Sequence, residues 1–264
     1  ALKKMLKSSS SDLSGDFVDS YVFMTSTGEY FDRETKARMG PRSFGVKHTR
    51  ETPADKDGVA QGATCYADNI IECVEADMYV PAFGEIFEHE NLKYVNRYRK
   101  SQIWPVAEGT TDIVDRVKAH IAHLLVDPVE QKIVIDYLAH NVQFPGKKIH
   151  WSIVLQGVQG DGKSFLAEMM RHVMGFHNVR MLDVQILESG FTGWAEGQCM
   201  TFIEELKLDN YRKYEVLNNL KPFITNETIS CHPKGCDPRV VVNTTNYFAL
   251  TNFKDAIPID DNDR

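Results

Sequence analysis

The eight residues from Gly157 to Ser164, GVQGDGKS, have the glycine spacing of a loop that binds phosphate. Glycines let main-chain N–H groups face inward, where side chains would block the approach of phosphate oxygens. The amine of Lys163 would reach the β- and γ-phosphates of a nucleotide, and the hydroxyl of Ser164 would bind magnesium. The spacing therefore predicts a site for ATP and Mg2+ formed by Gly157, Gly160, Asp161, Gly162, Lys163 and Ser164.

A pair of carboxylates follows the loop further along the chain. The apolar run CMTFIEEL ends in Glu204 and Glu205, about 40 residues after Lys163. A carboxylate at a strand end near the phosphate loop can hold the metal, and its neighbour can orient or deprotonate the attacking water. We expect Glu204 to bind the metal and Glu205 to activate water. The alternative is a solvated pair at the end of a strand.

The next apolar run is RVVVNTTN, which we interpret as a strand that closes on Asn246. A polar side chain at that strand end could contact the γ-phosphate or the attacking water, and Asn243 is the competing candidate. Before this run, two β-prone segments flank CHPKGCD, which predicts a hairpin whose Pro-Lys-Gly tip carries Lys234. A lone lysine on a turn is usually just solvated, but this hairpin lies between two runs that are expected to reach the nucleotide.

The elements around the loop have the order that phosphate binding requires. Residues 151–155 are an apolar run typical of a strand buried on both faces of a parallel sheet, and this run leads directly into Gly157. After the loop, SFLAEMMRHVMG predicts a helix that points its N-terminus at the phosphates and ends at Gly175. A strand before the loop and a helix after it favour a nucleotide site over a chance glycine loop.

Two further helices are predicted before the loop. In GTTDIVDRVKAHIAHLL, apolar residues recur at helical spacing, from Ile113 through Val117 and Ile121 to Leu124. A second helix starts at Asp127, with Pro128 in its first turn and Glu130 three residues beyond the cap, and runs to about Asn141. We interpret the histidines on these helices as partly exposed polar side chains rather than metal ligands: His120, His123 and His140.

The N-terminal part of the chain shows no legible chemistry. Its first ten residues are a Lys- and Ser-rich linker, YVFMTSTGEYFD predicts two strands around a turn, and residues 35–62 predict a loop with one short helix. The runs MYVPAFGEIFEHENLKYVNRY and SQIWPV predict further short strands. Tyr94, Tyr98 and Trp104 lie near basic residues and could bind nucleic acid, but a half-buried strand face is the favoured interpretation.

Composition limits the classes of function. The chain of 264 residues is 42% hydrophobic and carries a net charge of -7, so nucleic acid would be bound by a few well-placed cations rather than by a basic surface. No long apolar run or secretory core appears, so we expect a cytoplasmic protein with no membrane partner. The five cysteines, an odd number without a CxxC pair, favour reduced thiols. A zinc site of Cys231, His232 and Cys236 is the alternative.

Taken in this order, GVQGDGKS, MTFIEEL, the hairpin through Lys234, VVVNTTN and DDNDR resemble a superfamily 3 helicase of the branch found in phage and poxvirus-type primase-helicases. The resemblance covers about residues 110–264. It implies an α/β fold, an AAA+-like P-loop ATPase with a parallel sheet, and ATP-driven movement on single-stranded DNA in phage replication. It also implies assembly into a ring, commonly a hexamer, and a primase-polymerase module on the same polypeptide.

The resemblance also implies roles for single residues. Lys163 and Ser164 match the phosphate loop, Glu204 and Glu205 the metal and water carboxylates, and Asn246 the sensor asparagine. His232 and Lys234 match the hairpin residues that contact DNA, and Arg264 matches an arginine finger that acts on the nucleotide of a neighbouring subunit. Many relatives place Asp first in the carboxylate pair, so Glu204 reaches further than that pattern.

We therefore expect a small mixed α/β module at 1–105, a helical collar or linker at 106–146 and a P-loop ATPase domain at 147–264. Because the chain opens on Ala1 and stops on DDNDR, we expect an excised part of a longer polypeptide whose ATPase domain is truncated at its C-terminus. Two other functions stay open. One is a nucleotide-binding scaffold with negligible turnover, and the other is a P-loop phosphotransferase that acts on a small molecule.

Overall fold

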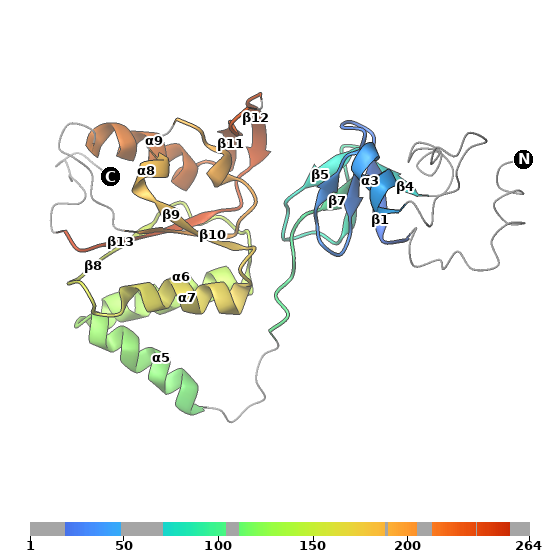
Figure 1. Cartoon of the computed structure of the whole chain (residues 1–264). Helices are drawn as coiled ribbons and strands as arrows, with labels where there is room; N and C mark the ends of the chain where they lie inside the picture. The colour runs from blue at the N-terminus through green and yellow to red at the C-terminus, as the bar shows by residue number, and fades with distance from the viewer. Residues whose placement is uncertain are drawn as a thin grey trace, which may run out of the picture. The chain divides into compact units, whose positions relative to one another are not determined.

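The computed structural model describes residues 19–48, 71–103, 111–187, 190–204, 213–235 and 237–253. The chain divides into two compact units. Unit 1 covers the chain up to Met78 together with Phe83–Arg97, and unit 2 covers Tyr79–Ala82 and the chain from Tyr98 onward. The domain boundaries predicted at residues 105 and 146 stay predictions. The two helices expected between them belong to unit 2 (Figure 1).

Unit 1 is a small mixed α/β body with two sheets. Its first sheet has the strand order β3-β2-β1-β4 and its second the order β5-β7-β6. The hairpin predicted in YVFMTSTGEYFD is confirmed as β1 and β2, which pair antiparallel around Gly28 at φ +66°. The short helix predicted in 35–62 is α3. The elements are β1 (Tyr21–Met24), β2 (Glu29–Asp32), β3 (Arg38–Met39), α3 (Pro41–Lys47), β4 (Glu72–Val74), β5 (Ala76–Met78), β6 (Ile86–His89) and β7 (Leu92–Asn96).

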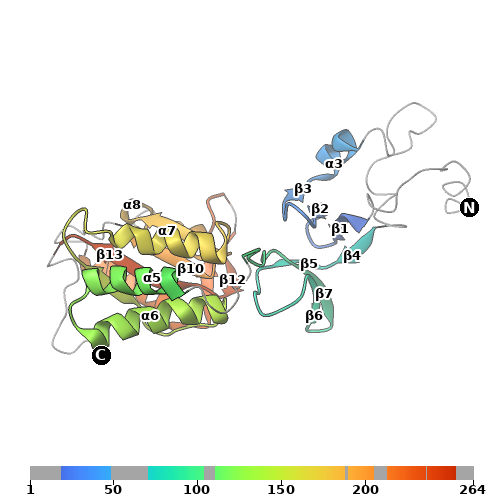
Figure 2. The same cartoon turned by 90° about the horizontal axis from the view of Figure 1, so that it is seen from below.

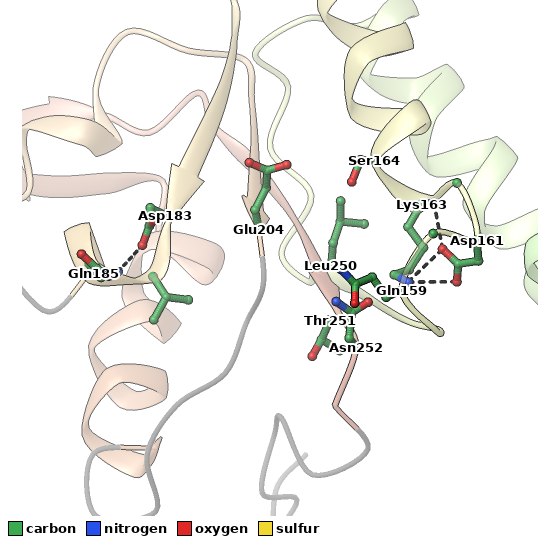
Figure 3. A pocket seen from close by; sticks show the side chains of 13 residues that line it. Gln159, Asp161, Lys163, Ser164, Asp183, Gln185, Glu204, Leu250, Thr251 and Asn252 are labelled. Carbon is green, nitrogen blue, oxygen red and sulfur yellow. Dashed lines mark hydrogen bonds and ion pairs between the residues drawn. The ribbon is translucent and has the colours of Figure 1, made fainter.

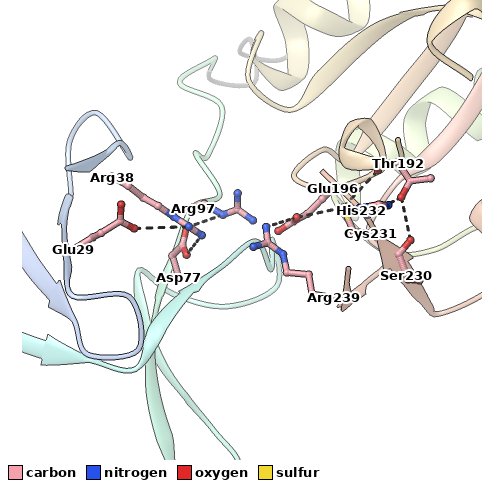
Figure 4. A network of polar contacts seen from close by, with 10 residues as sticks. All are labelled: Glu29, Arg38, Asp77, Arg97, Thr192, Glu196, Ser230, Cys231, His232 and Arg239. Atoms are coloured by element: carbon pink, nitrogen blue, oxygen red, sulfur yellow. Dashed lines mark hydrogen bonds and ion pairs between the residues drawn. The ribbon is translucent and has the colours of Figure 1, made fainter. Parts of the chain in front are cut away.

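A buried carboxylate links the two sheets of unit 1. The Asp77 side chain is 1% exposed and lies between two guanidinium groups, with Arg38 Nε donating to Asp77 Oδ2 at 3.1 Å and Arg97 Nε 3.0 Å from the same oxygen (Figure 4). A buried charge is tolerated only when it is paired and hydrogen-bonded. The arginines from β3 and from the end of β7 therefore join the two sheets through this one carboxylate.

Unit 2 is built on a four-stranded parallel sheet in the order β8-β13-β10-β9. The two central strands are almost wholly buried, and all six residues of β13 are buried. Such runs are typical of parallel strands covered on both faces. The parallel sheet of the predicted α/β fold class is thus confirmed. The strands are β8 (Ile153–Gln156), β9 (Val179–Asp183), β10 (Met200–Glu204) and β13 (Asn246–Thr251).

Helices cover the two faces of this sheet. On one face α6 and α7 pack over Phe202 and Phe248, and α5 lies on the same side (Figures 1 and 2). On the other face α9 and the turn η1 pack through Trp194 and Leu220 against Ile203. The predicted helices are confirmed, and the Asp127 side chain caps α6 by accepting from Val129 N–H at 2.8 Å. The helices are α5 (Thr111–Leu124), α6 (Pro128–Gln143), α7 (Lys163–Met174), α8 (Val184–Leu187), η1 (Gly193–Ala195) and α9 (Lys213–Thr225).

Three local predictions are wrong. The strand before the phosphate loop was expected to be buried on both faces, but β8 is at the edge of the described sheet and Val154 is 40% exposed. Residues Ser101–Ile103 form no strand, and the Ser101 hydroxyl donates to the Val173 carbonyl of α7 at 2.6 Å. The run RVVVNTTN is not one strand but the end of a hairpin, a buried connection and the start of β13.

Candidate functional site

The four strands of the parallel sheet in unit 2 end at one edge of the sheet, where their polar residues meet. The strands are parallel, and Gln156 is level with Thr251 while Glu204 is level with Asp183. Ligands of open parallel sheets bind at the carboxyl ends of the strands. At this edge Gly157 N–H donates to the Thr251 carbonyl at 3.1 Å, which fixes the start of the phosphate loop against the end of β13.

The phosphate loop has the backbone geometry that its glycines predict. Gly160 and Gly162 have φ values of +81° and +97°, a conformation that favours glycine. A Cβ atom added to Gly157 would lie 2.0 Å from Asp161 Oδ2 and 3.2 Å from Lys163 Nζ. The loop therefore depends on the missing side chain at Gly157, since the interior of the loop is filled by a charged pair.

This charged pair joins Lys163 to a carboxylate of the loop itself. Lys163 is 6% exposed, and its Nζ donates to Asp161 Oδ1 and Oδ2 at 2.9 Å and to the Val158 carbonyl at 2.7 Å. Lys163 N–H donates to Asp161 Oδ1 at 3.1 Å. Burial opposes ionisation of Asp161, but the hydrogen bonds from Lys163 outweigh it and hold the pKa of the carboxyl below its ordinary value. An anionic side chain thus takes the donors that a phosphate would use.

A cavity of about 620 Å³ opens beside the loop, a volume suited to a nucleotide-sized ligand (Figure 3). Figure 3 shows Glu204 between the phosphate loop and the end of β9. The Ser164 hydroxyl and the Glu204 carboxylate both line the cavity, and oxygen ligands of this kind suit magnesium. The cavity brings together residues 159–164, Asp183, Val184, Gln185, Glu204, Leu250, Thr251 and Asn252.

Asn246 does not reach this cavity, so its prediction as the sensor at the γ-phosphate is wrong. The residue begins β13 and therefore lies at the opposite edge of the sheet. Its side chain is fully buried, accepts from Ile149 N–H at 2.8 Å, and donates to Asn141 Oδ1 and to the Lys147 carbonyl, both at 2.9 Å. Asn243, the competing candidate, is also buried and donates to the Phe223 carbonyl at 2.7 Å.

Two residues at the cavity escaped the sequence analysis. Asn252 follows the last residue of β13 and lines the cavity, in the position that the analysis assigned to Asn246. Asp183 ends β9 beside Glu204, and its Oδ1 accepts from Gln185 N–H at 2.7 Å. Both follow an apolar run that ends in polar residues, YFALTN and VRMLD. The same pattern, an apolar run that ends in a polar residue, predicts Glu204 at its strand end.

The predicted hairpin is present, with its tip exposed. Strands β11 (Thr228–Cys231) and β12 (Arg239–Val242) pair antiparallel, and Lys234 is exposed next to Gly235 at φ +78°. His232 is half-buried, and its ring packs on Phe191 with centroids 5.6 Å apart. The structure therefore brings Lys234 and His232 to the same end of the hairpin, with the lysine further into solvent.

Next to its tip, the hairpin is anchored to the loop before η1 (Figure 4). Thr192 N–H donates to the His232 carbonyl at 3.0 Å, His232 N–H donates to Thr192 Oγ1 at 2.8 Å, and Thr192 Oγ1 donates to the Ser230 carbonyl at 3.2 Å. On the other arm, Arg239 donates to Glu196 at 2.7 Å. These contacts hold the tip end of both strands to the body of unit 2, while Lys234 beyond them is exposed.

Several predicted site residues lie outside the described part of the chain: Glu205, Arg264, Cys236 and Trp104. Their predicted roles stay predictions. Within the described ranges no group of three or more His, Cys, Asp and Glu side chains is arranged to hold a metal ion, and Cys231 is buried with its thiol directed to the Thr192 carbonyl. Of the helices in those ranges, none combines the length and apolarity needed to cross a bilayer.

Comparison with known proteins finds similarity to a phage primase-polymerase and to a family of unknown function. Residues 155–264 match a family of unknown function, DUF5906. The chain is 26% identical over 190 residues to the DNA primase-polymerase of Nitratiruptor phage NrS-1, an alignment that covers 70% of this chain and 26% of the relative. The expected resemblance to phage primase-polymerases is confirmed, although the chain spans only that quarter of the relative's length.

Solved structures show the same fold. The apo structure of the NrS-1 C terminal region superposes with a TM-score of 0.75 at 21% identity, covering 92% of this chain and 56% of that one. An A form apo structure of the same region gives a TM-score of 0.71 at 19% identity, covering 99% of this chain and 58% of that one. The α/β fold with its parallel sheet is therefore shared with that region.

Proposed function

We propose that this chain is the ATP-hydrolysing motor part of a phage replication protein and that it acts on single-stranded DNA. One observation carries the proposal: the phosphate loop, Glu204 and Asn252 line one cavity at the carboxyl edge of a parallel sheet. The similarity to a phage primase-polymerase supports replication as its setting. In the longer protein, the motor would accompany a primase-polymerase module.

The cavity residues divide the work of hydrolysis. The glycine loop and the Lys163 amine bind the β- and γ-phosphates, which must displace Asp161 from the lysine. Ser164 and Glu204 would hold Mg2+, which neutralises phosphate charge when bound. The Asn252 amide, at the end of the strand next to the loop, orients the attacking water or the γ-phosphate.

The hairpin is the DNA contact in this proposal. Lys234 at its exposed tip binds the phosphate backbone, so affinity is tolerant of sequence and falls with salt. Three buried residues, Asn243 to Thr245, connect β12 to β13, and the side chains of Thr244 and Thr245 both donate to the Gln198 carbonyl. Because β13 continues from this fixed connection to Asn252, it links the base of the hairpin, the end away from Lys234, to the nucleotide.

Assembly completes the proposal. We expect the longer protein to form a ring, in which Arg264 of one subunit acts on the nucleotide of its neighbour. Hydrolysis would then depend on protein concentration as well as on DNA, because an arginine acting in trans is supplied only within the assembly.

The direct test is ATP hydrolysis with and without single-stranded DNA. We expect turnover that DNA stimulates, and we expect Lys163→Ala to abolish it by removing the cation that contacts the phosphates. If the chain binds ATP without turnover at any protein concentration or with DNA, a nucleotide-binding scaffold replaces the motor. Transfer of the phosphate to a small acceptor in place of water would identify a phosphotransferase.

The DNA contact is tested by Lys234→Ala, with Lys118→Ala on α5 as a charge-matched control at another exposed lysine. We expect Lys234→Ala to weaken DNA binding severalfold, to reduce the salt dependence by about one phosphate contact, and to lower DNA stimulation. Equal effects of the two substitutions would show that the hairpin is not the DNA site.

A further inference from the structure

A histidine of α5 contacts the backbone of the phosphate loop. His120 Nε2 lies 3.1 Å from the Gly162 carbonyl oxygen, and its ring packs edge-on against Phe165 with centroids 4.8 Å apart. A Cβ atom added to Gly162 would lie 2.6 Å from His120 Cε1. His120 thus packs closely against the loop, although Gly162 lies 42 positions further along the chain.

The position of His120 is set by the core of unit 2. Its neighbour Ile121 is 1% exposed and belongs to the same cluster as Leu166 and Met170 of α7. Val117 and Leu124 of α5 pack against this cluster as partly buried side chains. Because α5 is anchored on both sides of His120, the contact with the loop follows from the packing of the helix.

The contact controls the direction of a phosphate-binding N–H. The Gly162 carbonyl and the Lys163 N–H belong to one peptide unit, and no described peptide bond is cis, so the two groups point in opposite directions. The carbonyl accepts from His120, while the N–H donates into the loop to Asp161 Oδ1 at 3.1 Å. Since a carbonyl oxygen can only accept, His120 carries a proton on Nε2.

Gly162 needs such an external constraint. Its φ of +97° lies in a region open to glycine, the residue whose backbone is least restricted and whose peptide unit turns most readily. Phe165 N–H also donates to the Gly162 carbonyl, at 3.0 Å, as part of the first turn of α7. The histidine supplies a second donor from outside the loop, and hydrogen bonding at the carbonyl also polarises the N–H of the same peptide.

We propose that His120 is a positioning residue for phosphate binding, which acts by holding the Gly162–Lys163 peptide with its N–H turned toward the nucleotide. This inference rests on the proposed function, since it assigns the loop to a nucleotide. It makes α5 part of the nucleotide site, so that a displacement of this helix turns a phosphate donor away. The role depends on the donor Nε2–H rather than on the ring as a packing group.

The test compares two substitutions in the whole chain by titration with ADP and ATP. His120→Phe keeps an aromatic ring beside Phe165 but has no donor, and we expect about tenfold weaker binding. His120→Gln places an amide N–H near the position of Nε2, and we expect it to restore most of the affinity. His123→Phe, at an exposed histidine of the same helix, is the matched control and should bind like the unsubstituted chain.

Melting temperatures separate loss of fold from loss of the donor. The inference is supported if His120→Phe melts near the unsubstituted chain, binds weakly and is rescued by His120→Gln. It is overturned if His120→Phe binds normally, or if His120→Gln binds as weakly as His120→Phe while both are folded. Absence of nucleotide binding by the unsubstituted chain is a different result, which removes the proposed function and this inference with it.

Discussion

In the parallel sheet of unit 2, the edge formed by the amino ends of the strands and the edge formed by their carboxyl ends carry the same residue types for different purposes. Strand β13 begins with Asn246 at one edge and is followed by Asn252 at the other. The Asn246 amide makes three hydrogen bonds, to groups of Asn141, Lys147 and Ile149, and is fully buried. Asn252 is half-buried and lines the 620 Å³ cavity. An asparagine with satisfied hydrogen bonds is structural, whereas one directed into a cavity is available to a ligand.

The lysines repeat this contrast. Lys148, near Asn246, donates to the main-chain carbonyls of Phe223 and Thr245 and lies over the Tyr247 ring at 5.1 Å. Lys163, at the other edge, donates to the Val158 carbonyl and also to both carboxylate oxygens of Asp161. Main-chain partners are fixed by the fold, but a loop carboxylate can move aside for phosphate. A lysine whose hydrogen-bond partner can be replaced by phosphate is therefore the functional one.

Removing the side-chain amide of Asn246, at the edge formed by the amino ends of the strands, should have the largest effect on stability. In Asn246→Ala, the Asn141 side chain, the Lys147 carbonyl and the Ile149 N–H lose their partner inside the protein, so we expect the free energy of unfolding to fall by about 2–4 kcal/mol. Urea unfolding measures the change. A stability within error of the unsubstituted chain would contradict the contrast between the two edges.

The matching substitution at the other edge is Asn252→Ala. We expect ATP hydrolysis to fall about 100-fold while nucleotide affinity and unfolding free energy change little, because the amide acts on the reacting groups and not on the fold. Steady-state kinetics and a binding titration separate these effects. If Asn252→Ala unfolds the protein or leaves the hydrolysis rate intact, Asn252 is not the sensor.

The exchangeable partner of Lys163 is tested by Asp161→Asn. Removing a negative charge from the place that phosphate occupies should tighten ATP binding by about 3- to 10-fold, because the phosphates no longer compete with a carboxylate for Lys163. Calorimetric titration gives the affinity directly. Weaker binding would instead mean that the Asp161 carboxylate is itself needed to bind the nucleotide.

The last prediction concerns the pH dependence of stability. Burial lowers the pKa of Lys148 to about 7, below its ordinary value, so in the folded state it releases its proton at lower pH than in the unfolded state. Between pH 7 and 10.5 the unfolded chain then binds more protons, and the unfolding free energy rises with pH by up to about 1.4 kcal/mol per unit. In Lys148→Met this contribution to the slope should vanish, whereas Lys147→Met at an exposed site should leave it. If the unfolding free energies of Lys148→Met and Lys147→Met depend on pH with the same slope, the lowered pKa of Lys148 is contradicted.

Much of unit 2 follows from local sequence. The helix spacing in α5, the Asp127 cap of α6, the glycines of the phosphate loop and the hairpin around Lys234 depend on neighbouring residues, and each was predicted correctly as an element. The apolar run before Glu204 also predicts the strand end at which this residue lies. Short-range patterns of this kind express backbone preferences and amphipathic faces, which a sequence displays directly.

Only the tertiary structure decided which polar residues share the cavity. The valines of RVVV suggest a buried strand, yet Val240 is 76% exposed on the hairpin, and the buried strand is the following run that starts at Asn246. Sheet order placed β13 beside β8, and therefore Asn252 beside the phosphate loop. The packing of α5 brought His120 to Gly162. Strand order and contacts between distant segments depend on how whole elements pack, so spacing along the chain could not reveal them.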